Sequence, residues 1–130
     1  MKKIEADATT PIKSWLTNVH KKTCAWEIKQ TEKDSIAYSR LETHQERWLL
    51  AVSNNVASYK ISDESIGHKP FDGFTFAKDK AYVIIYFKQS KTFYVITINN
   101  FVFYRDHKAK RKSLTEEEAK EIATYKVKIK

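Results

Sequence analysis

The residues best suited to chemistry are Glu27 and Lys29, which stand two positions apart in a segment of alternating character. The pattern over residues 23–30 predicts a strand, with Trp26 and Ile28 on one face and Glu27 and Lys29 on the other. Two such neighbours lie about 6–7 Å apart, measured between α-carbons. A carboxylate is a hard oxygen ligand that suits Mg²⁺, and a lysine beside it can hold a phosphate oxygen. The pair is equally compatible with a surface ion pair on the solvated face of an edge strand.

The net charge of the chain favours a polyanionic partner. Twenty-four Lys and Arg residues against sixteen Asp and Glu residues give a formal charge of +8, which promotes phosphate contacts and counterion release. Half of this excess falls on residues 105–112. A solvated loop that only keeps the protein in solution is the alternative interpretation. We expect this segment to bind the backbone of DNA, through Arg105, Lys108, Lys110, Arg111 and Lys112.

Length and composition exclude several classes of protein. A chain of 130 residues with 42% hydrophobic residues is expected to form one domain, residues 1–130, with its own core. The single cysteine, Cys24, excludes a disulfide framework, and the four scattered histidines argue against a zinc site. Two glycines are too few for a glycine-rich phosphate loop. Because the chain has neither a long apolar run nor a signal peptide pattern, we expect a soluble cytoplasmic protein.

A helix is predicted after the Glu-x-Lys strand. Ser39 and Glu42 have the spacing of a capping box, and Asn54-Asn55 ends the pattern. Between them one apolar stripe recurs at helical spacing, formed by Leu41, Trp48, Leu49 and Val52. Gln45 is the one polar member of this stripe, and the periodicity alone does not explain it. The aromatic rings of Trp15, Trp26 and Trp48 are expected in the core.

The second half of the chain predicts a hairpin, a helix and a closing strand. Residues 80–88 form a nearly continuous apolar run typical of a central strand, and residues 92–98 follow after a short turn. Ser113 and Glu116 repeat the capping-box spacing, and an alternating strand ends the chain. Residues 54–79 read as a long irregular region that could hold one short strand near 58–61. The sum is an α/β domain with a mixed central β-sheet flanked by helices.

Several segments together resemble one known family. AWEIKQT, LETHQERWL, VIIYF and SLTEEEAKEI are similar, in this order, to segments of Holliday junction resolvases of the RecU type, within the PD-(D/E)xK nuclease superfamily. The resemblance covers residues 23–130 and implies a restriction-endonuclease-like core with the Glu-x-Lys strand at the centre of the sheet. It implies that Glu27 binds the catalytic Mg²⁺ (or Mn²⁺) and that the Ile28 carbonyl adds a ligand. It further implies that Lys29 engages the scissile phosphate or attacking water, and that Gln45 faces the site.

Members of that family also have an aspartate on the strand before Glu-x-Lys. Three alternatives exist for its counterpart in this chain. Asp7 lies twenty residues upstream, so residues 11–22 would have to form an enlarged hairpin. Asp72, in the turn Pro70-Phe71-Asp72-Gly73, comes after Glu-x-Lys and would need a rearranged site. The third alternative is that the chain has no catalytic aspartate.

The sequence therefore leads to one main functional hypothesis and two rivals. The first is a Mg²⁺-dependent endonuclease that hydrolyses phosphodiester bonds in branched DNA and acts as a homodimer, as the resemblance implies. The second is a DNA-binding module on the same fold that has lost catalysis. The third is a basic RNA-binding or ribosome-associated domain, which would need exposed aromatic residues on a sheet face.

Overall fold

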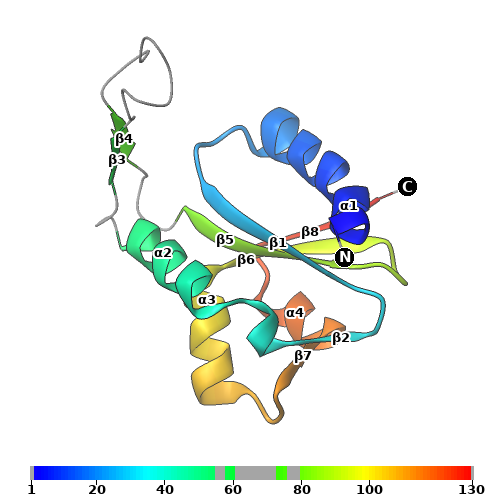
Figure 1. The fold of residues 1–130 in the computed structure, drawn as a ribbon. Helices are drawn as coiled ribbons and strands as arrows, with labels where there is room; N and C mark the ends of the chain where they lie inside the picture. Colours follow the sequence, from blue (N-terminus) through cyan, green and yellow to red (C-terminus); the bar gives the residue numbers. More distant parts are fainter. Residues whose placement is uncertain (1, 55–57, 61–72, 76–79, 130) are drawn as a thin grey trace.

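A computed structural model describes residues 2–54, 58–60, 73–75 and 80–129, and it describes side chains in 9–54 and 80–129 (Figure 1). The first half of the chain contains α1 (Lys2–Trp15), η1 (Leu16–His20), β1 (Ala25–Thr31), β2 (Ser35–Ala37), η2 (Tyr38–Arg40), α2 (Thr43–Ser53), β3 (Ser58–Lys60) and β4 (Gly73–Thr75). The second half contains β5 (Ala81–Phe87), β6 (Thr92–Thr97), α3 (Ile98–Phe103), η3 (Tyr104–Lys108), β7 (Ser113–Thr115), α4 (Glu116–Ile122) and β8 (Tyr125–Lys128).

A mixed four-stranded sheet in the order β1-β5-β6-β8 organises the molecule. β1 runs parallel to β5, while β5 with β6 and β6 with β8 are antiparallel. β5 is buried along its whole length, as expected for a strand covered on both faces. The prediction of an α/β domain with a mixed sheet is confirmed. β2 with β7 and β3 with β4 form two further strand pairs outside this sheet.

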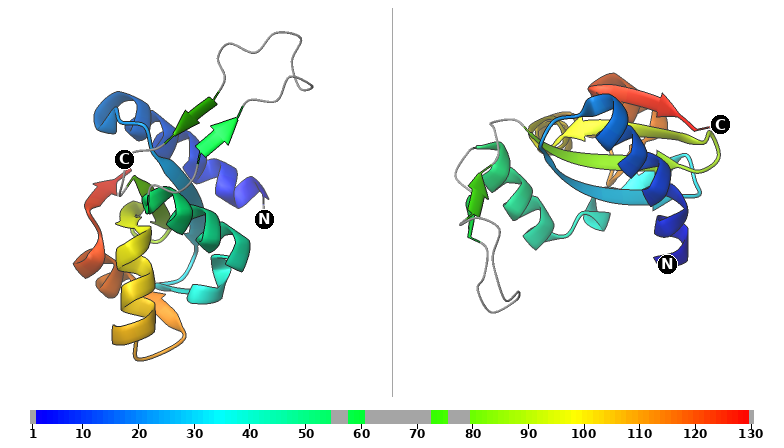
Figure 2. Two further views of the ribbon diagram at one scale, coloured as in Figure 1. Left: turned by 90° about the vertical axis from the view of Figure 1, so that its left-hand side faces the viewer. Right: turned by 90° about the horizontal axis from the view of Figure 1, so that it is seen from above.

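Helices cover both faces of the sheet, so two cores form (Figures 1 and 2). On one face α1 and η1 bury Ile12 and Leu16 against Ile28 and Ile84. On the other face α2, α3 and α4 pack on side chains that include Val83 and Ile85. Since side chains alternate along a strand, Glu27 and Lys29, the partners of Val83 and Ile85 in the register, lie on this second face. Within the described residues, no helix combines the length and the apolar character needed to cross a membrane.

The start of the chain is not the hairpin that the Asp7 alternative requires. Residues 11–22 do not form a hairpin, because α1 continues through Pro11 and leads into η1. Pro11 costs the helix one backbone hydrogen bond. The complete burial of Ile12 and the near-complete burial of Leu16 offset that cost and hold the helix on the sheet.

The position of β1 is a second correction. The resemblance places the Glu-x-Lys strand at the centre of the sheet, but β1 is an end strand of the four-stranded sheet. Its backbone pairs with β5 through odd-numbered residues, since Ala25 donates to the Lys80 carbonyl and Thr31 accepts from the Lys88 amide. The peptide groups of Ile28 therefore point toward the edge of β1 opposite β5.

Both helix starts lie a few residues later than the spacing predicts. Helix α2 has its capping box at Glu42 and Gln45, because Ser39 belongs to the short turn η2. Helix α4 is capped by Thr115 with Glu118, because Ser113 is engaged in β7. Asn54 ends α2 as predicted.

Two of the three tryptophans are outside the core. Trp48 is 55% exposed and Trp26 is 37% exposed, so the expectation of core burial is wrong for both. The inner stripe of α2 is centred on Leu49 and Val52, which leaves Trp48 at its margin. Trp15 packs against the core formed with α1, as expected.

Candidate functional site

Glu27, Lys29 and Gln45 meet on the sheet face covered by α2. Gln45 Nε2 donates a hydrogen bond of 3.0 Å to Glu27 Oε2. Lys29 Nζ lies 3.5 Å from the same oxygen. The prediction that Gln45 projects from its helix toward the Glu27 and Lys29 face is confirmed, and this contact explains the polar member of an apolar stripe. The three side chains form a polar cluster that we call the Glu27 site.

Burial distinguishes the members of the Glu27 site. The side chain of Lys29 is 10% exposed, whereas that of Glu27 is 33% exposed. An ammonium group in such a water-poor position interacts more strongly with a nearby anion than a surface lysine does. Lys29 thus has a charged neighbour in Glu27 and the restricted mobility of a mostly buried side chain.

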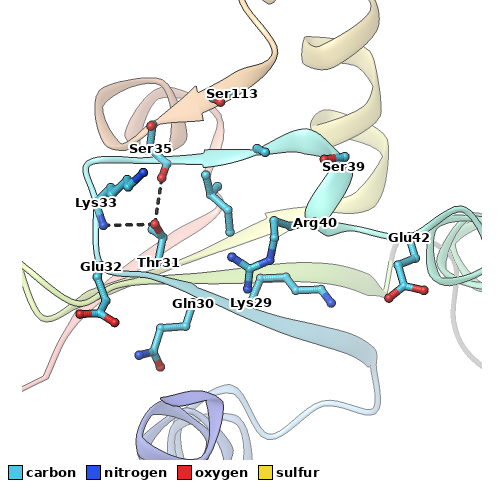
Figure 3. Close-up of a pocket in the computed structure, with 12 residues that line it drawn as sticks. Lys29, Gln30, Thr31, Glu32, Lys33, Ser35, Ser39, Arg40, Glu42 and Ser113 are labelled. Atoms are coloured by element: carbon cyan, nitrogen blue, oxygen red, sulfur yellow. Dashed lines mark hydrogen bonds between the residues drawn. The ribbon is translucent and has the colours of Figure 1, made fainter. Parts of the chain in front are cut away.

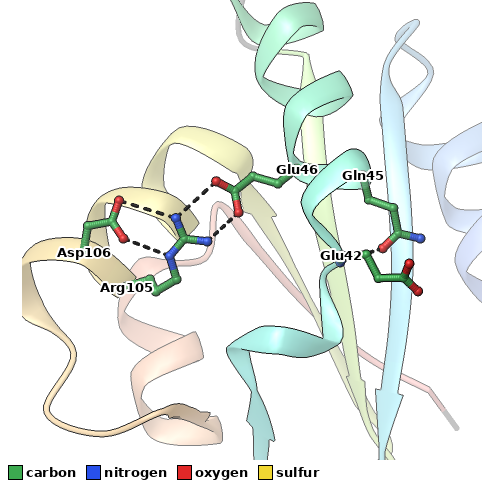
Figure 4. A network of polar contacts seen from close by, with 5 residues as sticks. All are labelled: Glu42, Gln45, Glu46, Arg105 and Asp106. Carbon is green, nitrogen blue, oxygen red and sulfur yellow. Dashed lines mark hydrogen bonds and ion pairs between the residues drawn. The ribbon is translucent and has the colours of Figure 1, made fainter.

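The capping box of α2 fixes the orientation of Gln45. Gln45 Oε1 accepts a hydrogen bond of 3.0 Å from the Glu42 amide, which leaves Nε2 for Glu27 (Figure 4). Exchanging the amide oxygen and nitrogen would lose both bonds. The helix start and the Glu27 site are therefore coupled through one side chain.

Glu27 and the neighbouring Ile28 carbonyl supply oxygen atoms of the kind that Mg²⁺ binds in proteins. The Glu27 carboxylate is partly accessible, and the Ile28 carbonyl points to the edge of β1 opposite β5, so two oxygen donors of the kind that Mg²⁺ prefers lie next to each other on the chain. Among the residues with described side chains, no group of three or more acidic, histidine or cysteine side chains is arranged to hold a metal ion.

The two candidate aspartates have different places. Asp7 lies in helix α1, which packs on the sheet face opposite Glu27, and its side chain is outside the described residues. Asp72 is itself outside the described residues. His44, next to Gln45 in the sequence, is a surface residue whose Nδ1 lies 3.6 Å from Glu42 Oε1.

The basic segment divides into one paired residue and four exposed ones. Arg105 forms a two-point ion pair with Glu46, with Nη2 donating to Oε2 at 3.1 Å, and it also contacts Asp106 (Figure 4). The hydrogen bonds that Arg105 donates to Glu46 and Asp106 hold the pKa of Arg105 above its usual value. Four other cations are exposed and not in an ion pair that the structure describes, namely Lys108, Lys110, Arg111 and Lys112.

The pair of Glu46 and Arg105 was not foreseen from the sequence. The two residues are 59 positions apart, and only the packing of α2 beside α3 brings them together. Glu46 follows Gln45 directly, so this ion pair anchors the first turn of α2 from the side opposite the Glu27 site. Arg105 therefore has a structural partner, unlike the four cations that follow it.

Comparison of the chain with protein-family models, with curated proteins and with solved structures finds no match. The resemblance to resolvases is carried by the sequence segments quoted above.

Proposed function

We propose that the chain is a metal-dependent endonuclease that hydrolyses phosphodiester bonds in branched DNA. The observation that carries the proposal is that Lys29 from strand β1 and Gln45 from helix α2 both contact the same carboxylate oxygen of Glu27. In metal-assisted phosphodiester hydrolysis a carboxylate can hold the ion, an ammonium group can stabilise charge on the phosphate, and an amide can orient the carboxylate. Helices on both faces of a mixed sheet are compatible with a restriction-endonuclease-like core, which the proposal includes.

Each residue has a distinct role in the proposed reaction. Glu27 and the Ile28 carbonyl hold Mg²⁺ or Mn²⁺, together with an aspartate. The bound ion supplies a water of lowered pKa and offsets charge on the phosphate. Lys29 stabilises the negative charge that develops on the phosphate oxygens, and Gln45 holds the Glu27 carboxylate in place.

The remaining features support DNA as the substrate. Lys108, Lys110, Arg111 and Lys112 hold the sugar-phosphate backbone without reading its bases. A branched junction has two symmetry-related strands, so we propose a homodimer that cuts both, acting on DNA in the cytoplasm. The rival hypothesis, a DNA-binding module without catalysis, is an outcome of the same test.

The test is cleavage of branched and linear DNA by the purified protein with Mg²⁺ or Mn²⁺. We expect cutting of branched DNA that stops when the metal is chelated. The variants Asp72→Asn and Asp7→Asn identify the second carboxylate, and we expect loss of cutting in Asp72→Asn, because α1 packs on the opposite face from Glu27. Binding of branched DNA without cutting by either metal would contradict the enzyme and favour the binding module.

A further inference from the structure

A pocket of about 800 Å³ adjoins the Glu27 site (Figure 3). It lies between the end of β1, strand β2, the turn η2 and the start of β7. Lys29 lines this pocket and also contacts Glu27, so the pocket and the Glu27 site are adjacent and share one cation. Nothing in the resemblance assigns a function to it.

The lining of the pocket is rich in hydrogen-bond donors. Lys29, Lys33 and Arg40 contribute cations, while Ser35, Ser39 and Ser113 contribute hydroxyl groups. In Figure 3 the guanidinium group of Arg40 lies beside the side chain of Lys29, whereas Gln30 points away toward α1. Arginine and lysine with serine hydroxyls form a donor set that suits a phosphate group.

The two carboxylates of the lining, Glu32 and Glu42, do not cancel this donor set. Glu32 lies in the turn after β1, on the solvent side. Glu42 takes part in the capping box of α2, and its Oε1 lies 3.6 Å from His44 Nδ1. With Glu27, which pairs with Lys29, three carboxylates balance the three cations, and the exposure of Glu32 and Glu42 to solvent weakens their effect on the pocket.

One wall of the pocket is held by local hydrogen bonds. Thr31 Oγ1 donates to the Ser35 carbonyl at 2.9 Å and accepts from the Lys33 amide at 3.2 Å. These bonds fix the turn between β1 and β2, which carries Lys33 and Ser35. The pocket is thus formed by the fold itself and does not require a bound ligand to shape this wall.

The exposed basic segment ends at the pocket. The Tyr38 amide donates to the Lys112 carbonyl at 3.0 Å, which joins the end of that segment to η2. Ser113, the next residue, lines the pocket. The basic segment therefore leads to the edge of the pocket at Ser113.

We propose that this pocket binds a phosphate of the DNA strand next to the one at the Glu27 site, with Arg40 as its principal contact. The inference rests on the proposed function in one respect, because Lys29 faces both phosphates. The strand that reaches Lys29 must continue through an adjoining space, and the pocket provides one with cations and hydroxyl groups. Its occupant is a backbone phosphate, so the pocket does not select a base.

The experiment is a methylphosphonate scan, in which single phosphates of one strand of a branched DNA are made neutral one at a time. Among the positions at which neutralisation weakens binding by the wild type, we expect one, next to the phosphate at the Glu27 site, at which the loss is about tenfold and depends on Arg40. Arg40→Ala should lower the affinity for unmodified DNA by a similar factor and should be insensitive to neutralisation at that position. Arg47→Ala removes an exposed arginine of α2 that does not line the pocket, and it should retain the sensitivity.

Two results would overturn the inference. The first is a scan in which Arg40→Ala shows the same position-dependent losses as the wild type. The second is a pair of observations: NMR detects binding of inorganic phosphate that depends on Arg40, and the methylphosphonate scan on DNA shows no sensitive position. The pocket would then bind free phosphate and not a phosphate of DNA. Failure of the proposed function is distinguishable, since a protein that never cuts DNA can still show one sensitive position that Arg40→Ala abolishes.

Discussion

Gln45 joins helix α2 to strand β1 by donating a hydrogen bond of 3.0 Å to Glu27 Oε2. The oxygen of the same amide accepts from the Glu42 backbone at the start of α2. One side chain thus caps a helix and restrains the carboxylate that we propose as a metal ligand. The helix start and the site should respond together when Gln45 is changed.

Replacing Gln45 tests this dual role. Gln45→Leu removes both bonds, so we expect the free energy of unfolding to fall by about 1 kcal/mol and the cleavage rate to fall about tenfold or more. Gln45→Glu retains an acceptor for the Glu42 amide but sets a second carboxylate against Glu27, so it should regain only part of the lost stability and should not restore cleavage. The measurements are chemical denaturation and single-turnover cleavage. A Gln45→Leu variant that cuts within about twofold of the wild-type rate would show that the bond to Glu27 has no catalytic consequence.

The ion pair between Glu46 and Arg105 should contribute to stability and little to DNA affinity. A double-mutant cycle with Glu46→Ala and Arg105→Ala is expected to give a coupling of about 1 kcal/mol, because the contact is two-point and partly buried. The coupling is measured by urea denaturation, and DNA affinity by fluorescence anisotropy. A coupling near zero, or an affinity loss in Arg105→Ala as large as in the exposed cations, would place Arg105 in the DNA-binding surface instead.

The four exposed cations of the basic segment should determine the salt dependence of DNA binding. Changing Lys108, Lys110, Arg111 and Lys112 to serine is expected to weaken binding to all DNA sequences and to flatten the salt slope by about one unit per lost phosphate contact. The control carries the same charge change at four other exposed lysines, away from this segment: Lys88, Lys120, Lys126 and Lys128. Equal effects of the two variants would show that only net charge matters.

Protonation of His20 should make the free energy of unfolding depend on pH. It is buried against the rings of Trp15, Tyr82 and Tyr125. Burial, followed by the positive charges of Lys80 and Lys22, lowers the pKa of His20 below its ordinary value of 6.5. The unfolded chain therefore binds the proton of His20 more readily than the folded chain does. The contribution of neutral His20 to stability is fully present above about pH 6.5 and is lost as the pH falls below that value.

The measurement is the midpoint of urea denaturation at several pH values between 5 and 8, for the wild type and for His20→Phe. We expect the part of the acid-induced loss that is due to His20 to disappear in His20→Phe, since phenylalanine carries no titrating group. An unchanged pH dependence in that variant would assign the loss to other groups.

Local patterns predicted the parts of the structure that depend on local periodicity. The apolar run over residues 80–88 predicted a buried strand, and β5 is that strand. The periodicity did not explain Gln45; the resemblance implied that it faces the Glu-x-Lys strand, and the bond to Glu27 agrees with that. The burial of β5 follows from the spacing of its own segment, whereas the direction of Gln45 does not.

Features that depend on long-range pairing could not be predicted in this way. The position of β1 at the end of the sheet depends on which strands pair, and the sequence pattern of a strand does not identify its partner. The contact of Glu46 with Arg105 needs α2 and α3 to be packed first. Proline disfavours the interior of a helix, yet at Pro11 the packing of Ile12 and Leu16 outweighs this local preference.

The central claim is that Glu27 acts through its negative charge as a metal ligand for DNA cleavage. The most direct measurement compares wild type and Glu27→Gln for Mg²⁺-dependent cutting of branched DNA, with binding measured in parallel without metal. The substitution keeps the shape of the side chain and removes its charge, so we expect cutting to be abolished while binding and thermal stability change little. Cutting by Glu27→Gln at the wild-type rate and with the same Mg²⁺ dependence would contradict the claim.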